Sequence, residues 1–215
     1  MIQWYPGHMA KAKRILKEDL KLVDIVIEVV DARVPFSSQN PDLRNLINDQ
    51  TKVTVLNKKD LADQKLNQKW IKYFNQKEDA VLLNSLTGEG VSDLNNTYDQ
   101  ISAKLAAKGR NPRRLRAMII GIPNVGKSAL INLLAGSKIT SIGNKPGVTR
   151  GRQWVNVSKK IRLLDTPGIL WPKFSDEDKA YKLALTGAVD NDIFDFELAA
   201  YKLIKFIINI NENII

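Results

Sequence analysis

Residues 121–128 read Gly-Ile-Pro-Asn-Val-Gly-Lys-Ser and follow the apolar run Ala-Met-Ile-Ile at 117–120. The two glycines, the lysine and the serine occupy the positions that a phosphate-binding P-loop requires after a strand. The glycines let backbone N–H groups close around a phosphate, Lys127 adds positive charge at the β- and γ-phosphate oxygens, and the Ser128 hydroxyl suits Mg²⁺. The alternative is a chance glycine-rich turn. The complete motif favours a nucleotide site and predicts these phosphate-binding residues: Asn124, Val125, Gly126, Lys127, Ser128 and Ala129.

Apolar runs of strand length alternate with longer amphipathic or polar stretches on both sides of this loop, which is typical of βαβ units around a parallel sheet. The expected strands are residues 23–30, 52–56, 80–83, 117–121, 154–157 and 161–164. Several of these runs are almost continuously apolar, as expected where helices cover both faces of a sheet. We therefore predict an α/β P-loop NTPase fold, a doubly wound, mostly parallel six-stranded sheet with a short C-terminal helical appendage.

Composition limits the class of protein. The 215 residues include 33 Lys and Arg against 23 Asp and Glu, for a formal net charge of +10. A global excess of this size favours a polyanionic partner such as nucleic acid, and a basic surface that only keeps the protein soluble is the alternative. The chain has no cysteine, so we expect neither a disulfide framework nor a thiolate metal site. No run approaches the roughly 18 apolar residues of a membrane span, and we expect a soluble, cytoplasmic protein.

Two further segments have the pattern of phosphate-sensing motifs. Asp165-Thr-Pro-Gly168 follows an apolar run, where a carboxylate can hold Mg²⁺ through water and the Gly168 N–H can approach a γ-phosphate. Thr149 is the candidate switch threonine that closes on Mg²⁺ and the γ-phosphate. Each is an ordinary turn by itself, but their positions downstream of a P-loop favour the functional interpretation. The predicted Mg²⁺ ligands are Ser128, Thr149 and Asp165.

The motif expected to recognise the base is Asn57-Lys-Lys-Asp60, which follows an apolar run. Guanine presents two adjacent donors, N1–H and the N2 amine, and the Asp60 carboxylate can accept from both, whereas adenine lacks this pair. Lys58 is expected to lay its stem along the purine face. Asn84 and Ser85 follow the next apolar run and are candidates to offer a backbone N–H to guanine O6. An exposed charged turn is the alternative, and the placement at strand ends in a P-loop protein favours guanine recognition.

The order of these motifs is circularly permuted. In a conventional small GTPase the P-loop comes first and the guanine motif comes late, but here residues 57–60 and 84–86 precede 121–128 and 165–168. The same sheet forms only if the original termini are joined and new ones are opened elsewhere, which chain ends close in space allow. The new break falls just after residue 168, so whatever follows is tethered to the segment that senses the γ-phosphate.

With these motifs the chain resembles the YlqF/YawG-type circularly permuted GTPases, and specifically their ribosome biogenesis GTPase A branch. Besides NKKD and GIPNVGKS, the resemblance rests on WYPGHMAKA at 4–12, DARVP at 31–35, NKPGVT at 144–149 and DTPGILWPKF at 165–174. It implies a GTPase that binds GTP and GDP and acts in late assembly of the large (50S) ribosomal subunit. It also implies that the protein binds ribosomal RNA on the subunit precursor. We expect the protein to be a monomer off the ribosome.

We expect two domains. Residues 1–174 form the circularly permuted GTPase domain, and residues 175–215 form a C-terminal helical segment. The resemblance implies an RNA-binding domain there, and because the chain ends soon after the first helices we expect that domain to be incomplete. Ser175 and Asp178 match a capping box. A second amphipathic helix is expected from the helical spacing of Phe196, Ala199, Leu203 and Ile207.

Basic side chains gather in two places. Residues 8–21 predict a helix whose cations lie largely off its apolar face, and residues 104–116 form the densest basic stretch, which we expect to connect two halves of the sheet. Solvated charges are the alternative for both. The predicted contacts with ribosomal RNA are Lys11, Lys13, Arg14, Arg113, Arg114 and Arg116.

Catalysis needs a group beyond the common motifs. Many GTPases carry Gln directly after DxxG to orient water, but this chain has Ile169, so intrinsic hydrolysis is expected to be slow and stimulated by the ribosomal subunit. The predicted catalytic residues are Lys127 and His8. The resemblance implies the role of His8, and the alternative is a histidine that only starts a helix or hydrogen-bonds nearby backbone. It also implies a K⁺ ligand at Asn124 that replaces the charge of an arginine finger, and a local turn is the alternative there.

Two other functions stay open on sequence grounds. One is a GTP-dependent RNA-modification or tRNA-related switch, and the other is a nucleotide-sensing scaffold with negligible turnover. Subunit-stimulated phosphate release favours the ribosome-assembly GTPase over both. Binding to mature tRNA but not to ribosomal subunits favours the first alternative.

Overall fold

The computed structural model describes residues 7–39, 46–47, 50–110, 114–137, 154–164, 177–188 and 194–210, and within these ranges the side chains of residues 7–13, 155 and 210 are not described. The strands are β1 (Ile25–Asp31), β2 (Thr51–Asn57), β3 (Asp79–Leu82), β4 (Leu115–Ile120), β5 (Trp154–Asn156) and β6 (Ile161–Leu164). The helices are α1 (Gly7–Leu20), α2 (Pro35–Ser38), α3 (Gln64–Asn75), α4 (Val91–Ala107), α5 (Lys127–Ala135), α6 (Glu177–Leu185) and α7 (Phe196–Ile210), with a short 3-10 turn, η2, at Lys59–Leu61.

These strands form one sheet in the order β3-β2-β1-β4-β6-β5 within the described part of the chain. The pairs β1–β2, β1–β4, β2–β3 and β4–β6 are parallel, and only the edge strand β5 runs antiparallel to its neighbour. Each strand lies within two or three residues of the apolar run that predicted it. The predicted α/β P-loop fold with a mostly parallel sheet is confirmed.

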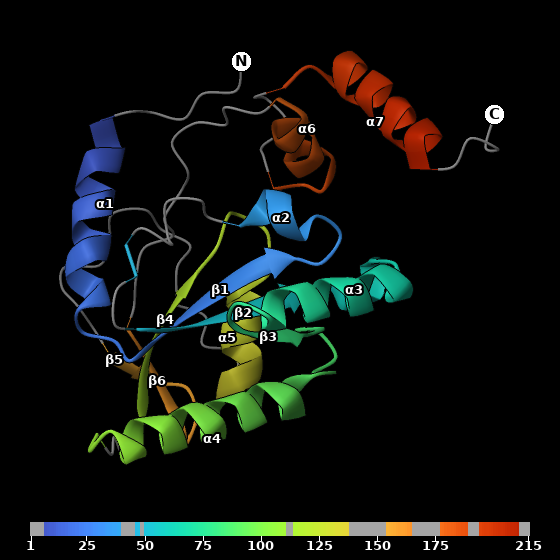
Figure 1. The fold of residues 1–215 in the computed structure, drawn as a ribbon. Helices are drawn as coiled ribbons and strands as arrows, with labels where there is room; N and C mark the ends of the chain where they lie inside the picture. The colour runs from blue at the N-terminus through green and yellow to red at the C-terminus, as the bar shows by residue number, and fades with distance from the viewer. Residues whose placement is uncertain are drawn as a thin grey trace.

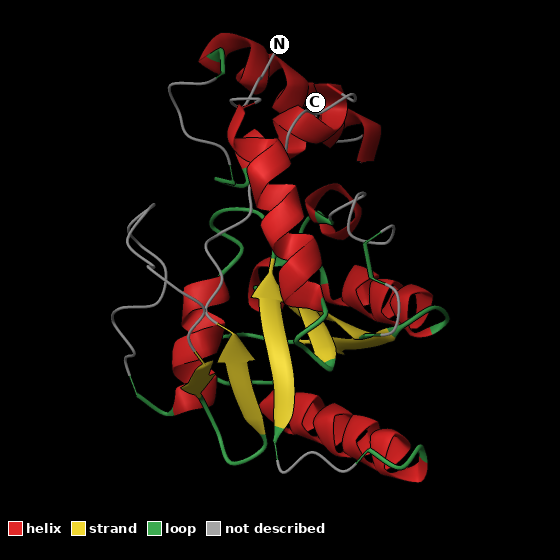
Figure 2. Cartoon of the chain, turned by 90° about the vertical axis from the view of Figure 1, so that its left-hand side faces the viewer, coloured by secondary structure: helices red, strands yellow, loops and turns green. Residues whose placement is uncertain are grey.

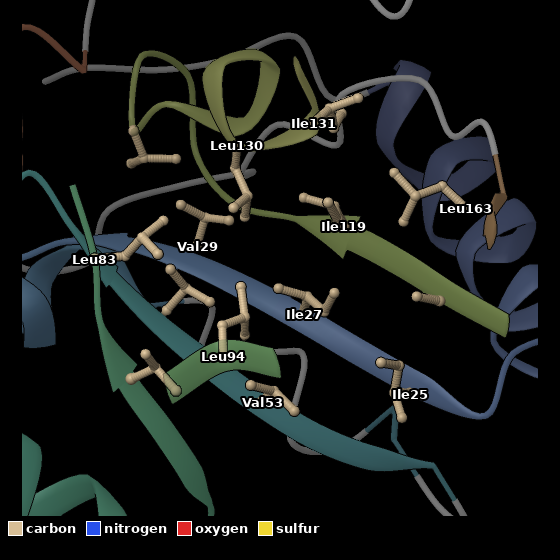
Figure 3. Close-up of a cluster of buried hydrophobic side chains, with 14 of the residues drawn as sticks. Ile25, Ile27, Val29, Val53, Leu83, Leu94, Ile119, Leu130, Ile131 and Leu163 are labelled. Carbon is tan, nitrogen blue, oxygen red and sulfur yellow. The ribbon is translucent and has the colours of Figure 1, made fainter. Parts of the chain in front are cut away.

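Helices cover both faces of the sheet because the central strands are apolar on both faces (Figures 1 and 2). Alternate residues of β1, such as Ile27 and Val29, pack with α4 and α5 in the largest buried cluster, part of which Figure 3 shows. On the other face, Val26 packs against α1, and Val30 packs against α3. Each fully buried aliphatic side chain contributes about 1.5–3 kcal/mol relative to exposure, so this two-sided core stabilises the sheet.

The chain order changes direction between β1 and β4. From β1 the chain proceeds outward through β2 to β3, whereas β4 is followed by β5 and β6 on the opposite side. In open α/β sheets, ligands bind beyond the carboxyl ends of the strands at such a switch point. In Figure 1, α2 and α6 lie beyond the carboxyl end of β1, and α1 begins at the same end of the molecule.

Three features differ from expectation or refine it. Residues 104–107 of the predicted connector belong to α4, and residues 115–116 belong to β4, so the connector is shorter than expected. The apolar residues that predicted α7 are mostly exposed, and among them only Ala199 is buried. Helix α6 packs into the main core through Leu183 and Ala184. None of the described helices is both long and apolar enough to be a candidate membrane span.

Candidate nucleotide-binding site

The P-loop lies between β4 and α5 and has the backbone shape that its glycines predict. Gly121 passes so close to β1 that an added Cβ would lie 2.5 Å from the Val29 carbonyl oxygen. Gly126 is left-handed (φ 99°) at the N-terminus of α5, where an added Cβ would collide with the Asn57 side-chain amide. A helix N-terminus reached through a close-packed glycine loop is suited to bind a phosphate.

Asn57 joins the motif expected to recognise the base to the phosphate loop. Its buried Nδ2 donates to the Val125 carbonyl oxygen over 2.8 Å, and its Oδ1 accepts from the Ser85 backbone N–H over 3.0 Å. A single side chain therefore links three segments of the predicted site that are far apart in sequence. This arrangement restores, in space, the site that the permuted motif order predicts.

The loop after β3 is shaped by Asn84. Its Oδ1 accepts from the backbone N–H groups of Leu86 and Thr87, and its own N–H donates to the Glu89 carbonyl oxygen. Asn84 and Ser85 are both buried, whereas Leu86 at the tip is exposed. Asn84 therefore holds the loop backbone in place. The Ser85 N–H, one of the candidates to bind guanine O6, donates to the Asn57 Oδ1 atom in this structure.

Lys58 and Lys59 point to different partners. The Nζ of Lys58 lies 3.0 Å from Oδ2 of Asp31, at the end of β1, and the Nζ of Lys59 lies 2.6 Å from Oε1 of Glu89. Asp60, in the 3-10 turn that follows, is exposed. The carboxylate expected to recognise guanine is therefore open to solvent. The neighbouring Lys58 is held by its ion pair with Asp31.

Asp31 is buried and carries the contacts of a charged group. Arg33 donates to it from its backbone N–H (3.0 Å), from Nε (2.9 Å) and from a terminal nitrogen (2.7 Å). Burial raises the pKa of Asp31, but the hydrogen bonds from Arg33 and Lys58 outweigh it, and the pKa is lowered below its ordinary value. The same guanidinium donates to the Thr186 carbonyl oxygen at the end of α6, 3.0 Å away.

Lys127 folds back over its own loop. Its Nζ donates to the carbonyl oxygens of Gly121 (2.9 Å) and Ile122 (2.6 Å). Burial lowers its pKa from the ordinary 10.5 to about 8, because the charged form loses solvation. An incoming phosphate would offer this ammonium group a negative partner. Ser128 is exposed in the first turn of α5, and Ala129 follows it.

Asn124, like Lys58 (φ 59°), is a non-glycine residue of the site with a left-handed backbone (φ 58°). Its Nδ2 donates to the Gly187 carbonyl oxygen over 2.8 Å, just beyond α6. The P-loop and the β1–α2 turn therefore both contact the C-terminal end of α6.

Four residues predicted for the nucleotide site lie wholly or partly outside the described residues. Thr149, Asp165 and Gly168 lie outside the described residues, and so does the side chain of His8, which is in the first turn of α1. The described residues contain no cluster of three or more His, Cys, Asp or Glu side chains that could hold a metal ion.

Comparisons with known proteins agree with this geometry. Residues 116–212 match the model of a family described as "50S ribosome-binding GTPase". The chain is 47% identical over 211 residues to ribosome biogenesis GTPase A of Bacillus cereus, which covers 96% of this chain and 71% of that protein. It is 38% identical over 210 residues to ribosome biogenesis GTPase A of Thermotoga maritima, with 93% and 74% covered. The chain belongs to the ribosome biogenesis GTPase A family.

A comparison with a solved structure leads to the same family. The chain is similar to the crystal structure of GNP-bound YlqF from T. maritima, with a TM-score of 0.65, 30% sequence identity, and 93% of this chain and 75% of that chain covered. The predictions of family, fold class and GTPase activity are confirmed. The match to the family model begins at residue 116, after the guanine motif, which is consistent with the permuted order.

The described basic residues of this family member have different surroundings. Arg14 is exposed on α1, and Arg114 is partly buried. The Arg116 guanidinium makes two hydrogen bonds to the carboxylate of buried Asp24, and its backbone N–H makes a third. The same carboxylate binds Arg110 at 2.7 Å. Arg116 therefore has a structural partner at the amino end of the sheet, opposite the P-loop. Arg113 lies outside the described residues, as do the side chains of Lys11 and Lys13.

Two residues at the site were not assigned a role from the sequence. Asp31 and Arg33 belong to the DARVP stretch, one of the segments on which the family resemblance rests. One signal was available: an acidic residue at the end of a buried strand that neighbours the strand of the guanine motif. Arg33's link to residue 186 depends on how α6 packs, and no local pattern predicts it.

Proposed function

We propose that this chain binds GTP through the site between β1, β2 and β4 and hydrolyses it during assembly of the large ribosomal subunit. The observation that carries the proposal is the pair of hydrogen bonds of the Asn57 side chain. It donates to the Val125 carbonyl oxygen and accepts from the Ser85 N–H, so it joins the guanine motif, the Ser85 loop and the P-loop in one site. The names of the relatives add the ribosomal setting. GTP and GDP are the proposed ligands, and the cytoplasm is the proposed compartment.

Guanine specificity is proposed to come from Asp60, which is exposed beside Lys58. A carboxylate only accepts hydrogen bonds, whereas an amide also donates. Asp60→Asn should therefore weaken GDP binding and increase relative affinity for xanthosine diphosphate, measured by competition with a fluorescent nucleotide. Equal competition by ADP and GDP in the unmodified protein would contradict guanine specificity.

Metal ions are proposed to complete the phosphate site. Ser128 offers an exposed hydroxyl beside the P-loop lysine, and oxygen donors of this kind suit Mg²⁺. Thr149 and Asp165 are the other proposed Mg²⁺ ligands. Asn124 is the proposed K⁺ ligand, and its amide already contacts the Gly187 carbonyl oxygen. Faster GTP hydrolysis in K⁺ than in Na⁺, lost in Asn124→Ala, supports that role, and equal rates in both salts contradict it.

The proposed macromolecular partner is a precursor of the large subunit with its ribosomal RNA. The net charge of +10 and the exposed cations of α1 support a polyanionic partner. Co-sedimentation with ribosomal subunits in sucrose gradients, with GDP or with a non-hydrolysable GTP analogue, tests it. Enrichment on large subunits with the GTP analogue is expected. Binding to mature tRNA instead would favour an RNA-modification or tRNA-related switch, and subunit binding without stimulated hydrolysis would favour a nucleotide-sensing scaffold.

His8 is proposed to take part in hydrolysis, because Ile169 cannot orient water and imidazole can exchange a proton near neutral pH. The first turn of α1 lies at the end of the molecule where α2 and α6 lie (Figure 1). His8→Ala should keep GDP and subunit binding and lose most of the subunit-stimulated rate. A stimulated rate equal to that of the unmodified protein would rule out this role.

The division into a GTPase domain (residues 1–174) and a C-terminal helical segment (residues 175–215) is likewise a proposal. The Thr186 and Gly187 carbonyl oxygens, which bind Arg33 and Asn124, give this segment direct contacts with the nucleotide site. Because α6 also supplies Leu183 and Ala184 to the main core, removing residues 175–215 should lower stability as well as alter nucleotide affinity and RNA binding.

A further inference from the structure

The end of β1 places a carboxylate directly beside the guanine motif. Asp31, the last residue of β1, lies opposite Asn57, the last residue of β2, in the parallel register. Lys58 is the next residue, and its Nζ lies 3.0 Å from the Asp31 Oδ2 atom. The carboxyl ends of two neighbouring strands therefore form an ion pair at the base-binding side of the site.

Hydrogen bonds to its backbone and side chain hold Asp31 in place. Its side chain is 4% exposed, and Arg33 holds Oδ1 with its backbone N–H and Nε. The Asp31 backbone N–H donates to the buried Ser38 hydroxyl over 3.0 Å. Because these contacts fix the carboxylate, its Oδ2 atom stays in one position relative to Lys58.

Lys58 has a backbone conformation that side chains rarely adopt. Its φ of 59° and ψ of 37° lie in the left-handed region, which is unfavourable for a residue with a Cβ. Such conformations persist where surrounding contacts hold them, and they cluster at ligand sites. Here the Lys58 carbonyl oxygen accepts from the Leu61 N–H over 3.0 Å, and the ammonium group contacts Asp31. Contacts therefore hold both the backbone carbonyl and the ammonium group of Lys58.

We propose that Asp31 is a positioning residue for guanine nucleotides: its carboxylate holds the Lys58 ammonium group so that the lysine stem stays in place along the purine face. A long side chain that is already ordered loses less rotamer entropy when a base packs on it. Asp31 acts through Lys58 and not on the phosphates, so it raises affinity for the base part of the ligand. The inference rests on the proposed guanine-binding role of Lys58.

The neighbouring lysine provides a matched control. Lys59 pairs with Glu89 at 2.6 Å, and the Glu89 side chain is 66% exposed. Glu89→Gln removes an ion pair from the same four-residue motif but leaves Lys58 and Asp31 untouched. Exposed pairs of this kind contribute little.

The experiment compares two ligands, GDP and inorganic pyrophosphate, by isothermal titration calorimetry on the full chain with Mg²⁺. Asp31→Asn keeps an oxygen that can accept from Arg33 but removes the charge. Affinity for GDP should fall about tenfold, as expected for one lost charge-assisted contact, with pyrophosphate binding unchanged. Lys58→Met, which removes the positive partner of the same ion pair, should show the same pattern. The double variant should lose no more GDP affinity than either single variant. Glu89→Gln should bind both ligands normally.

Each other outcome has a defined meaning. An equal loss for GDP and pyrophosphate would assign Asp31 a general structural role and overturn the proposal. Unchanged GDP affinity in Lys58→Met, or additive losses in the double variant, would also overturn it. If Asp31→Asn does not fold, Lys58→Met still tests the proposal. Weaker GDP binding with normal pyrophosphate binding supports it, and unchanged GDP affinity overturns it. Failure of the unmodified protein to bind GDP at all would instead contradict the proposed function.

Discussion

The side-chain amide of Asn57 donates a hydrogen bond to the carbonyl oxygen of Val125 over 2.8 Å, although 68 residues separate them in the sequence. The same side chain accepts from the Ser85 N–H. Asn57 is buried, so both contacts are shielded from water. In a permuted chain this amide holds the guanine motif on the P-loop, and its loss should affect phosphate and base binding together.

Asn57→Asp tests this connection. A carboxylate still accepts from Ser85 but cannot donate to the Val125 oxygen, and it faces that oxygen with negative charge. Leaving a buried acceptor unsatisfied costs about 1–3 kcal/mol, which corresponds to about a 5- to 150-fold loss of GDP affinity if the loop shifts. Equilibrium binding of a fluorescent GDP analogue measures it. Asn75→Ala, which removes a cap on the Ala80 N–H away from the site (2.9 Å), should alter only thermal stability.

Gly126→Ala tests the same region through sterics. The new Cβ would collide with the Asn57 amide, and the backbone is left-handed (φ 99°). We expect GDP affinity to fall by at least about tenfold, since displacing Asn57 by this route costs more than about 1.4 kcal/mol. Gly136 is the matched control, because it is also left-handed (φ 65°) but has nothing within 4 Å of an added Cβ. Gly136→Ala should cost about 1 kcal/mol of unfolding free energy and leave GDP binding intact. Normal GDP binding by Gly126→Ala would contradict the close packing.

Asp24→Asn tests the ion cluster at the amino end of the sheet. Burial raises the pKa of Asp24, but hydrogen bonds and charge from Arg116, with the charge of Arg110, lower it below the ordinary 3.8. At pH 7 the variant should lose about 2–3 kcal/mol of unfolding free energy, because two partly exposed arginines lose a buried partner. A group with a lowered folded-state pKa contributes stability above its unfolded pKa and loses it as pH falls through the folded value.

The difference between this variant and the unmodified protein should therefore shrink below about pH 4. Urea denaturation at pH 7 and pH 3 measures it. Asp99→Asn provides the control, because its pair with Lys160 (2.6 Å) is exposed on both sides and should contribute less than about 1 kcal/mol. A constant difference across this pH range would mean that Asp24 stabilises the fold without its charge.

The sequence predicted the elements and motifs of the site, but not the contacts between them. Strand positions and glycine spacing are local patterns, so the P-loop and the guanine motif could be located from single segments. The Asp31–Lys58 pair depends on strand register, and the Asn124–Gly187 contact depends on the docking of α6. These follow from packing, which no local pattern contains.

Net charge is a poor guide to which basic residues bind RNA, for a related reason. A stretch of arginines indicates how much charge is present, but not which side chains already have partners. Arg116 was predicted to bind RNA, and in the fold its guanidinium is engaged by Asp24, 92 residues away in the sequence. Whether it also contacts RNA stays a prediction. The exposed Arg14 is the better position for a test of RNA binding.

Lys127 makes the protein's nucleotide affinity and stability depend on pH in opposite directions. Burial lowers its pKa from 10.5 to about 8 in the nucleotide-free site. Unfolding exposes the lysine and restores the higher pKa, so between these two values the unfolded chain binds more protons than the folded one. The free energy of unfolding should therefore rise as pH increases from about 8 toward 10. Thermal melting without nucleotide measures this effect.

Nucleotide binding should show the reverse trend. The phosphates favour the charged ammonium group, so binding above pH 8 requires a proton to be taken up. At pH 9 only about a tenth of a group with a pKa near 8 is protonated, and GDP affinity should fall about tenfold from its value at pH 7. Calorimetry at pH 8.5 in two buffers of different ionisation enthalpy should detect the proton uptake. Lys127→Arg separates this titration from that of guanine itself, because a guanidinium stays charged throughout this range. The arginine variant should bind more weakly but lose the pH-dependence assigned to Lys127, and an identical pH profile in both proteins would show that another group is responsible.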